Sequence, residues 1–137
     1  MDEWLKLYAG QSERKGETRT YLAVRDHRVV GYVSLMAISI SPTGQPSSSK
    51  RKVPGVLIAR LAIETSWQNL GLGKMLLSHA LKTSLEISEK VGIKVVAIEP
   101  LSDELCTYYQ RFGFEALGHT SRLMVLGISK IKKTKLS

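Results

Sequence analysis

The stretch from Leu57 to Lys74 constrains the fold of this chain more than any other. It consists of a mostly apolar run, a short polar turn, and then Gly71 and Gly73 at the start of a long segment with helical apolar periodicity. A helix N-terminus exposes unpaired N–H groups and carries a partial positive charge, so it can bind an anion. No acidic residue follows Gly71 until Glu86. The stretch therefore predicts a strand, a turn and a helix whose first turn binds an external anion.

Two common phosphate-binding loops do not fit this stretch. A Walker A loop would require a glycine and a hydroxyl residue where the chain has Gln68 and Met75. A dinucleotide-binding loop would require a third glycine, and the chain has Leu76 there. The pattern that remains is Gln68-x-x-Gly71-x-Gly73. By itself it also suits a tight strand-to-helix turn in which a glycine serves packing, so both interpretations stay open at this point.

A second motif lies downstream, at the end of a helix expected from about Ser102. It reads Tyr109-x-x-Phe112-Gly113-Phe114, and Gly113 is a typical helix stop. Buried aromatic residues on a core helix would give the same letters. The two motifs occur in order and are joined by a helix and a strand. Together they resemble the two signatures of the GNAT acyl-CoA N-acetyltransferases.

This resemblance implies that acetyl-CoA is the co-substrate, and no residue spacing indicates a metal. The resemblance also implies that backbone groups of one strand align the pantetheine and polarise the thioester carbonyl, while the following loop binds the pyrophosphate. The implied cofactor-binding residues are Leu61, Ala62, Ile63, Gln68, Asn69, Leu70, Gly71, Leu72, Gly73 and Lys74. Tyr109 is the implied catalytic residue, because the family's tyrosine faces the thiol end of the coenzyme and can protonate the leaving thiolate.

The sequence indicates no carboxylate or histidine as a general base. This favours an α-amine as the acceptor, since an α-amine with a pKa of about 7.7–8.0 is partly neutral at pH 7, unlike a lysine at about 10.4.

A closer resemblance covers nearly the whole chain, from Asp2 to about Ile128. The matching residues are Trp4-Leu5, Ala9, Gln11, Arg14, Arg19-Thr20-Tyr21, Gly31-Tyr32-Val33-Ser34-Leu35, Pro54 and Arg60-Leu61-Ala62-Ile63. They look like the GNAT toxins of bacterial type II toxin–antitoxin systems. This resemblance implies a toxin that acetylates the α-amine of aminoacyl-tRNA and so blocks translation. The implied partner is a small DNA-binding antitoxin of the ribbon-helix-helix type. A homodimer is a separate expectation that the resemblance does not decide.

Two other functions compete with the toxin. One is an ordinary GNAT acetyltransferase of a small amine or a protein N-terminus, for which no neighbouring gene for a ribbon-helix-helix protein would be expected. The other is a non-catalytic GNAT-like domain that binds RNA or a protein, which would fail to bind acetyl-CoA.

Charge gives separate support for a nucleic-acid substrate. The net charge is +8, and an excess of this size favours polyanions through steering and counterion release. Arg14 and the run Lys50, Arg51 and Lys52 are the candidate nucleic-acid contacts. Coenzyme A alone would explain part of the positive charge, and a basic tail is often only solvated.

Composition limits the class of protein. The 137 residues suit a single domain over 1–137, with a flexible basic tail from about 130. No apolar run approaches about 18 residues, so we expect no membrane span. The N-terminus lacks the pattern of a signal peptide, and a single cysteine suits a reducing compartment, so we expect a cytoplasmic location. The three histidines show no metal-ligand spacing.

Periodicity predicts a mixed α+β order of elements. Helices are expected over 2–15, 72–91 and 102–111, and strands over 18–24, 28–40, 56–64, 93–98, 114–117 and 122–128, with a turn at Asp26-His27. This is a GNAT-type mixed, mostly antiparallel sheet flanked by helices, but the chain would begin in a helix and lack the usual first strand. Either that strand lies outside this sequence or a neighbouring chain covers the sheet edge, because an uncovered edge invites pairing.

Overall fold

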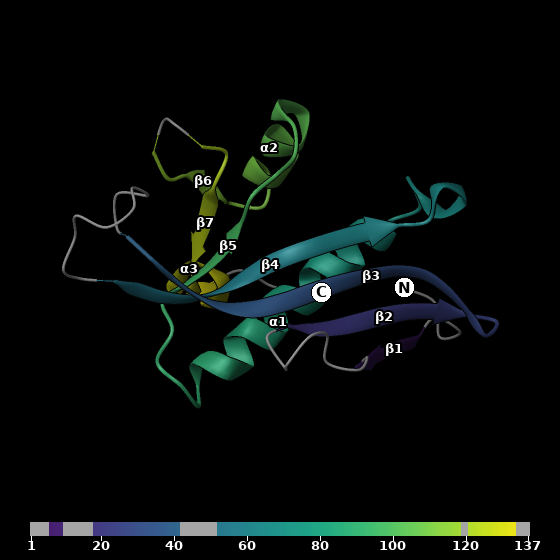
Figure 1. Ribbon diagram of the computed structural model, residues 1–137, viewed down its shortest axis with the longest axis horizontal. Helices are drawn as coiled ribbons and strands as arrows, with labels where there is room; N and C mark the ends of the chain where they lie inside the picture. Colours follow the sequence, from purple (N-terminus) through teal and green to yellow (C-terminus); the bar gives the residue numbers. More distant parts are fainter. Residues whose placement is uncertain (1–5, 10–17, 42–51, 119–120, 134–137) are drawn as a thin grey trace.

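The computed structural model describes residues 6–9, 18–41, 52–118 and 121–133 of the chain. In these residues one seven-stranded sheet is combined with three α-helices, which confirms the α+β class (Figure 1). The strands are β1 (Lys6–Ala9), β2 (Arg19–Arg25), β3 (Arg28–Ile40), β4 (Val53–Ile63), β5 (Val95–Ile98), β6 (Glu115–Ala116) and β7 (Met124–Gly127). The helices are α1 (Leu72–Ser88), α2 (Asp103–Gln110) and α3 (Ile128–Lys133), and a short 3-10 helix, η2 (Thr65–Trp67), precedes α1.

The strand order in the sheet is β1-β2-β3-β4-β5-β7-β6. Neighbouring strands are antiparallel except β4 and β5, which are parallel and are connected through α1. A parallel pair needs such a crossover, whereas antiparallel neighbours can be joined by a tight turn. The mostly antiparallel sheet predicted from the sequence is therefore confirmed.

The N-terminal helix predicted over 2–15 is wrong for the residues that the structure describes there. Lys6–Ala9 forms a strand that pairs with β2 in antiparallel register along its whole length. The prediction used a coarse apolar stripe, and a short stripe does not separate a helix from a strand when a sheet edge offers backbone partners. The described chain therefore starts in a strand, and β1 covers the edge of β2 that we expected to be open.

The hairpin between β2 and β3 matches the sequence prediction. Asp26 and His27 form its turn, with φ angles of 51° and 64°. Positive φ at both central residues gives a turn whose twist suits the flanking strands, and short polar side chains tolerate this conformation better than most. Strand β3 occupies Arg28–Ile40, as predicted.

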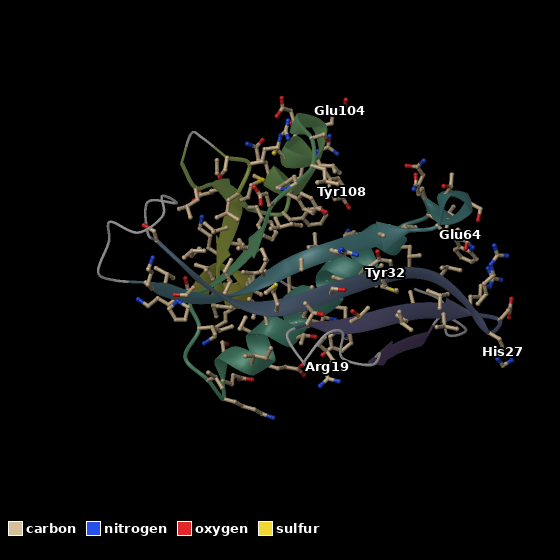
Figure 2. The ribbon with its side chains drawn as sticks, viewed as in Figure 1. Arg19, His27, Tyr32, Glu64, Glu104 and Tyr108 are labelled. Atoms are coloured by element: carbon tan, nitrogen blue, oxygen red, sulfur yellow. The ribbon has the colours of Figure 1, made fainter. Side chains whose placement is uncertain are left out.

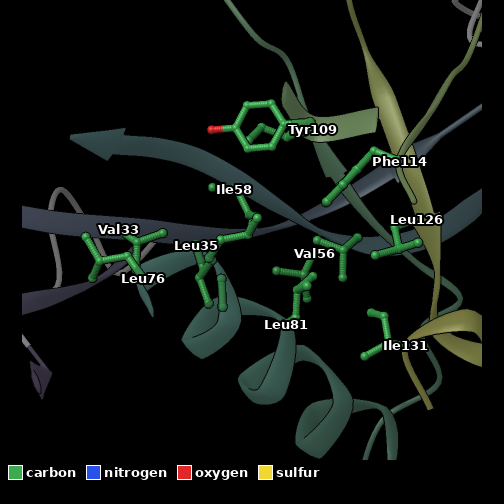
Figure 3. Packing of buried hydrophobic residues seen from close by; sticks show 14 of the residues in the cluster. Val33, Leu35, Val56, Ile58, Leu76, Leu81, Tyr109, Phe114, Leu126 and Ile131 are labelled. Carbon is green, nitrogen blue, oxygen red and sulfur yellow. The ribbon is translucent and has the colours of Figure 1, made fainter. Parts of the chain in front are cut away.

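The hydrophobic core lies between one face of the sheet and helices α1 and α3. Helix α1 packs on β3 and β4, and its buried residues recur at helical spacing; they are Leu72, Leu76, Leu77, Ala80, Leu81 and Ser84. Facing them are alternate residues of the strands, including Val33, Leu35, Val56 and Ile58 (Figure 3). Full burial of such a side chain contributes about 1.5–3 kcal/mol. We refer to this side of the sheet as the α1 face.

Strand β4 changes register in its middle. Leu35 of β3 lies opposite Ile58 while Ser34 lies opposite Arg60, so Ala59 is an extra residue in β4. Such a bulge bends a strand and shifts the alternation of its side chains. As a result, Ile58 and Leu61 both reach the hydrophobic core although they are three positions apart.

The pairing of β4 with β5 is short. It joins Gly55–Ile58 to Val95–Ile98 and ends there, while β4 continues to Ile63. At the start of the pair, a Cβ on Gly55 would lie 2.6 Å from the carbonyl oxygen of Val95, so only glycine allows this approach. Beyond Ile58 the two strands part, and β5 and α2 run away from the course of β4 (Figure 1).

The C-terminal segment is ordered further than the sequence indicated. We expected a flexible tail from about Lys130, but α3 continues to Lys133. Ile128 and Ile131 are 7% and 1% exposed and belong to the core that includes α1, so the packing of these two side chains holds the helix in place. In the part of the chain that the structure describes, no helix is both long and apolar enough to cross a membrane.

Candidate active site

The loop between β4 and α1 is held in shape by its own residues. The Gln68 side chain donates a hydrogen bond from Nε2 to the Ile63 carbonyl oxygen, over 3.2 Å. Asn69 and Gly71 have φ angles of 65° and 83°, which allow the chain to reverse sharply before the helix. The Gln68 side chain thus closes the loop on the end of β4, so its predicted contribution to the binding site would come through the shape of the loop.

The N-terminus of α1 has no internal partner for its first N–H groups. Its N-cap is Gly71, no side chain accepts a hydrogen bond there, and the first turn holds no acid. The first helical bond runs from Met75 N to Gly71 O, so the N–H groups of the three residues between them have no carbonyl of the helix to bond. Lys74 adds a positive charge at the same point. The arrangement predicted from the sequence is therefore present, and it suits an anion.

Space for a ligand differs between the two glycines. A Cβ on Gly71 would meet no atom within 4 Å, so the loop is open on that side. A Cβ on Gly73 would lie 3.0 Å from Ile63 Cδ1 and 4.0 Å from the Tyr108 hydroxyl. Gly73 therefore lies where the loop, the end of β4 and helix α2 come closest together.

The end of β4 offers a free backbone edge. Leu61, Ala62 and Ile63 pair with β3 on one side, whereas the pairing with β5 has already ended at Ile58. A free strand edge can hydrogen-bond an extended ligand in the way it would bond another strand. These three residues therefore have the geometry that the sequence comparison with the GNAT fold implied for pantetheine.

Helix α2 brings two adjacent tyrosines to this opening. Tyr109 is 6% exposed and packs against Phe114, with ring centroids 5.9 Å apart (Figure 3). Tyr108 is half-buried, and its ring lies 5.2 Å from that of Tyr109 at the end of α2 that faces β4 (Figure 2). Among the described residues, no buried side-chain oxygen or nitrogen lacks a partner, and we find no hydrogen bond to the Tyr109 hydroxyl. That hydroxyl therefore keeps contact with solvent although its ring is buried.

Both phenols are held in their protonated form. Burial, and to a smaller extent the neighbouring Tyr108, raises the pKa of Tyr109 above its usual value. Burial also raises the pKa of Tyr108, while the Arg111 guanidinium acts in the opposite direction. Each tyrosine can therefore donate a proton near neutral pH, and geometry has to decide between them.

The structure brings together the predicted cofactor residues, whereas of the predicted nucleic-acid residues it describes only Lys52. The loop, the end of β4 and the Tyr108 hydroxyl meet at Gly73. Lys52 is exposed and precedes Val53, at the opposite end of β4 from Ile63. Arg14, Lys50 and Arg51 lie outside the described residues.

The sequence analysis missed a cavity of about 800 Å³ beside the parting strands. Three chain segments that are far apart in sequence line it: Leu57–Ala59, Glu99–Leu101 with Asp103, and Ser121 with Arg122. Glu99 directly follows β5 and is exposed. An acid directly after a strand was the available signal, but only the sheet topology brings it beside β4. Within the described residues no three of the His, Cys, Asp and Glu side chains are grouped to hold a metal ion.

Comparison with known proteins gives a consistent result. A family model described as an acetyltransferase (GNAT) domain matches residues 16–116. The tRNA-acetylating toxin of Mycobacterium tuberculosis is 30% identical in an alignment of 119 residues that covers 84% of this chain and 72% of the relative. A crystal structure of a KacT mutant with one tyrosine changed to phenylalanine has a TM-score of 0.78 at 28% identity, covering 85% of this chain and 75% of that one.

A second solved structure, AtaTR bound with AcCoA, has a TM-score of 0.77 at 29% identity and covers 89% of this chain and 77% of that one. The matching family model spans most of the sheet, both signature motifs and the opening between β4 and α2. On sequence and on structure, this chain belongs to the GNAT family of acetyltransferases.

Proposed function

We propose that this protein is a toxin that transfers the acetyl group of acetyl-CoA to the α-amine of aminoacyl-tRNA and thereby stops translation. The observation that carries the proposal is the uncapped, acid-free N-terminus of α1, which faces the tyrosines of α2 across the free edge of β4. The substrate follows from the 30% identical relative named as a tRNA-acetylating toxin.

Acetyl-CoA would be bound by two backbone surfaces. The N–H groups from Asn69 to Lys74 would hold the pyrophosphate, with the Lys74 ammonium close by. The free edge of Leu61, Ala62 and Ile63 would align the pantetheine and place the thioester carbonyl against a backbone N–H. Because both surfaces are backbone, the sequence can vary around them provided that Gly71 and Gly73 leave room.

The reaction joins the acceptor nitrogen to the acetyl carbon and breaks the carbon–sulfur bond. The neutral amine attacks the thioester carbonyl, the nitrogen loses one proton to solvent, and the departing thiolate takes one proton from a phenol. The phenol then regains its proton from solvent. A positioned acid of this kind typically contributes about 10²–10⁴-fold.

We assign the acid role to Tyr109. Its hydroxyl keeps contact with solvent while its ring is fixed by Phe114 and Tyr108, so the group is both accessible and rigid. The Tyr108 hydroxyl instead points toward Gly73, where the pyrophosphate would bind. Successive helical residues differ by about 100° in direction, so only one of the two can face the thiol.

Charge supports the choice of acceptor. The net charge of +8 favours a polyanion, and the candidate phosphate contacts remain Arg14, Lys50, Arg51 and Lys52. If tRNA is bound mainly through phosphates, log affinity should fall linearly with log salt concentration, by about 0.7–0.9 for each phosphate neutralised.

We also propose two protein partners for this toxin. A small antitoxin of the ribbon-helix-helix type would hold the toxin inactive, and two copies of the chain would form a homodimer. Because aminoacyl-tRNA is used by ribosomes, the proposed place of action is the cytoplasm.

The deciding experiment supplies purified protein, labelled acetyl-CoA and charged tRNA at low salt. We expect label on the aminoacyl-tRNA, none on uncharged tRNA, and arrest of cell-free translation only when acetyl-CoA is present. Protein that binds acetyl-CoA but leaves charged tRNA unlabelled while acetylating a small amine would overturn the tRNA proposal. Reversal of Lys50, Arg51 and Lys52 to Glu should weaken tRNA binding and leave acetyl-CoA affinity unchanged.

A further inference from the structure

We infer that the cavity lined by Leu57–Ala59, Glu99–Leu101, Asp103 and Arg122 binds the aminoacyl group of the acceptor and selects amino acids with an uncharged, apolar side chain. In this site the Glu99 carboxylate accepts a hydrogen bond from the α-amine. The inference rests on the proposed function, because it specifies which charged tRNAs the enzyme uses. We call this space the acceptor cavity.

The acceptor cavity lies at the point where β4 and β5 part. The last residues to pair are Ile58 and Ile98, and the residues that follow them, Ala59 and Glu99, line the cavity from its two sides. Leu57 also lines it, and Leu57 alternates with Val56 and Ile58 of the hydrophobic core. The cavity therefore extends to the face of the sheet opposite the α1 face. Tyr109 belongs to the same hydrophobic cluster as Ile58, which also lines the cavity, so an acceptor held there would lie near the proposed acid (Figure 3).

The wall of the acceptor cavity nearest the parting strands is apolar. It is formed by Leu57, Ile58, Ala59, Pro100 and Leu101. Leu101 is 86% exposed, the largest exposed fraction among the large apolar side chains that the structure describes. A side chain of the acceptor that covers Leu101 would remove apolar surface from water, whereas a charged side chain would lose hydration without a partner. This wall therefore discriminates between classes of amino acid.

The charged residues of the cavity divide into a neutralised pair and a single carboxylate. Arg122 Nε lies 3.2 Å from Asp103 Oδ1, and Arg122 Nη1 donates a hydrogen bond of 3.2 Å to the Leu101 carbonyl oxygen. Asp103 and Arg122 thus offset each other and fix the backbone of Leu101. Glu99 has no ion-pair partner among the described residues, which leaves one negative charge in the cavity.

This charge suits an esterified amino acid in particular. Esterification to tRNA removes the negative carboxylate of the amino acid, so the aminoacyl group presents a basic α-amine and a side chain. Glu99 attracts the amine and repels an acidic side chain, while the apolar wall accepts an aliphatic one. The combination of one carboxylate with an apolar wall therefore favours aliphatic over acidic aminoacyl groups.

The first test charges a single tRNA with different amino acids and measures kcat/KM for acetyl transfer. Aliphatic aminoacyl groups should be preferred over aspartyl and glutamyl groups by at least about tenfold, since even small apolar differences in a pocket change kcat/KM by 10–200-fold. Equal use of all aminoacyl groups would refute the inference while leaving the tRNA proposal intact. Labelling of none of them would instead refute the proposed function.

The second test separates the amine contact from the general integrity of the site. Glu99→Gln should raise KM for aliphatic aminoacyl-tRNA by about tenfold, because the acceptor of the amine's hydrogen bond loses its negative charge, with little change in kcat or in acetyl-CoA affinity. Glu99→Asp should restore part of the effect. The matched control is Glu104→Gln, which removes the same charge from an exposed residue of α2 outside the cavity. Equal KM values for Glu99→Gln and the control would overturn the role of Glu99.

The third test addresses the apolar wall. Leu101→Ser should reduce kcat/KM for aliphatic aminoacyl-tRNA by about tenfold and narrow the gap to the acidic ones. Val91→Ser removes an apolar side chain with 61% exposure just beyond the C-terminal end of α1 and should change neither value. A Leu101→Ser enzyme with unchanged preference would show that this wall does not select the acceptor.

Discussion

Helices α1 and α2 both flank the free edge of β4, but their N-termini are built in opposite ways. Helix α2 has Ser102 as its N-cap, which accepts a hydrogen bond of 3.2 Å from Leu105 N, and it carries Asp103 and Glu104 in its first turn. Helix α1 has a glycine N-cap, no capping side chain and no acid. In α2, side chains of the protein itself accept a hydrogen bond from the first turn and offset the helix dipole. In α1 the first N–H groups remain available to a ligand. We therefore assign ligand binding to the N-terminus of α1 and the catalytic side chain to α2.

The largest effect on activity should come from removing the hydroxyl oxygen of Tyr109 in α2. Tyr109→Phe should lower kcat by about 10²–10⁴-fold, because the thiolate loses its proton donor, with little change in acetyl-CoA affinity or in folding. Steady-state kinetics and calorimetry would measure these quantities. Tyr108→Phe is the matched control and should retain most of its kcat. If the two variants exchange these roles, Tyr108 is the acid.

The next largest effect should come from closing the α1 N-terminus. Gly71→Val should weaken acetyl-CoA binding by about 100-fold or more, since the branched side chain fills open space and the positive φ angle is strained in any residue with a Cβ. Titration calorimetry on folded protein would test this. Gly92→Val is a suitable control, because a Cβ there also meets no atom within 4 Å and the residue lies after α1. Unchanged affinity in Gly71→Val would mean that acetyl-CoA binds elsewhere.

A third change would give the first turn of α1 an acidic residue, as the first turn of α2 has. Lys74→Glu places an acid in the first turn of α1, which should stabilise the free protein by about 0.3–1 kcal/mol through the helix dipole. The same change should weaken acetyl-CoA binding by about tenfold, because a carboxylate then faces the pyrophosphate. Lys94→Glu alters the net charge equally in a loop away from both helix N-termini. Chemical denaturation should show higher stability and calorimetry lower acetyl-CoA affinity for Lys74→Glu. The control Lys94→Glu should not show this combination.

The smallest effect should come from making α2 resemble α1. Ser102→Ala removes the cap and should cost about 1 kcal/mol of unfolding free energy, measurable in urea, because one N–H loses its partner. Acetyl-CoA affinity should not change. A loss of affinity as large as that of Gly71→Val would contradict the division of roles between the two helices.

The elements that local residues determine were predictable. The start of α1 at Leu72 was expected from the glycines before a run with helical periodicity, and the helix expected from about Ser102 begins at Asp103 with Ser102 as its N-cap. The Asp26-His27 turn followed from short polar residues between two apolar runs. In each case the deciding residues are neighbours in the sequence.

The features that the sequence did not predict depend on distant residues. Strand β1 exists because β2 offers an edge, and α3 is ordered because Ile131 reaches the core formed with α1. The acceptor cavity depends on the bulge at Ala59 and on where the pairing of β4 with β5 stops, which only the register reveals. Glu99 was therefore not recognisable as a site residue before the sheet was known.

The short parallel contact between β4 and β5 has a consequence for how the protein holds together. Strands β1 to β4 form one part of the sheet and β5, β7 and β6 form the other. Among the described residues, strand pairing joins the two parts only between Gly55–Ile58 and Val95–Ile98. A ligand that hydrogen-bonds the edge of β4 and also contacts α2 would connect the two parts of the sheet. When acetyl-CoA is bound, amide hydrogen exchange should therefore slow in both parts of the sheet. The co-substrate would then stabilise the fold of the enzyme as well as take part in its reaction.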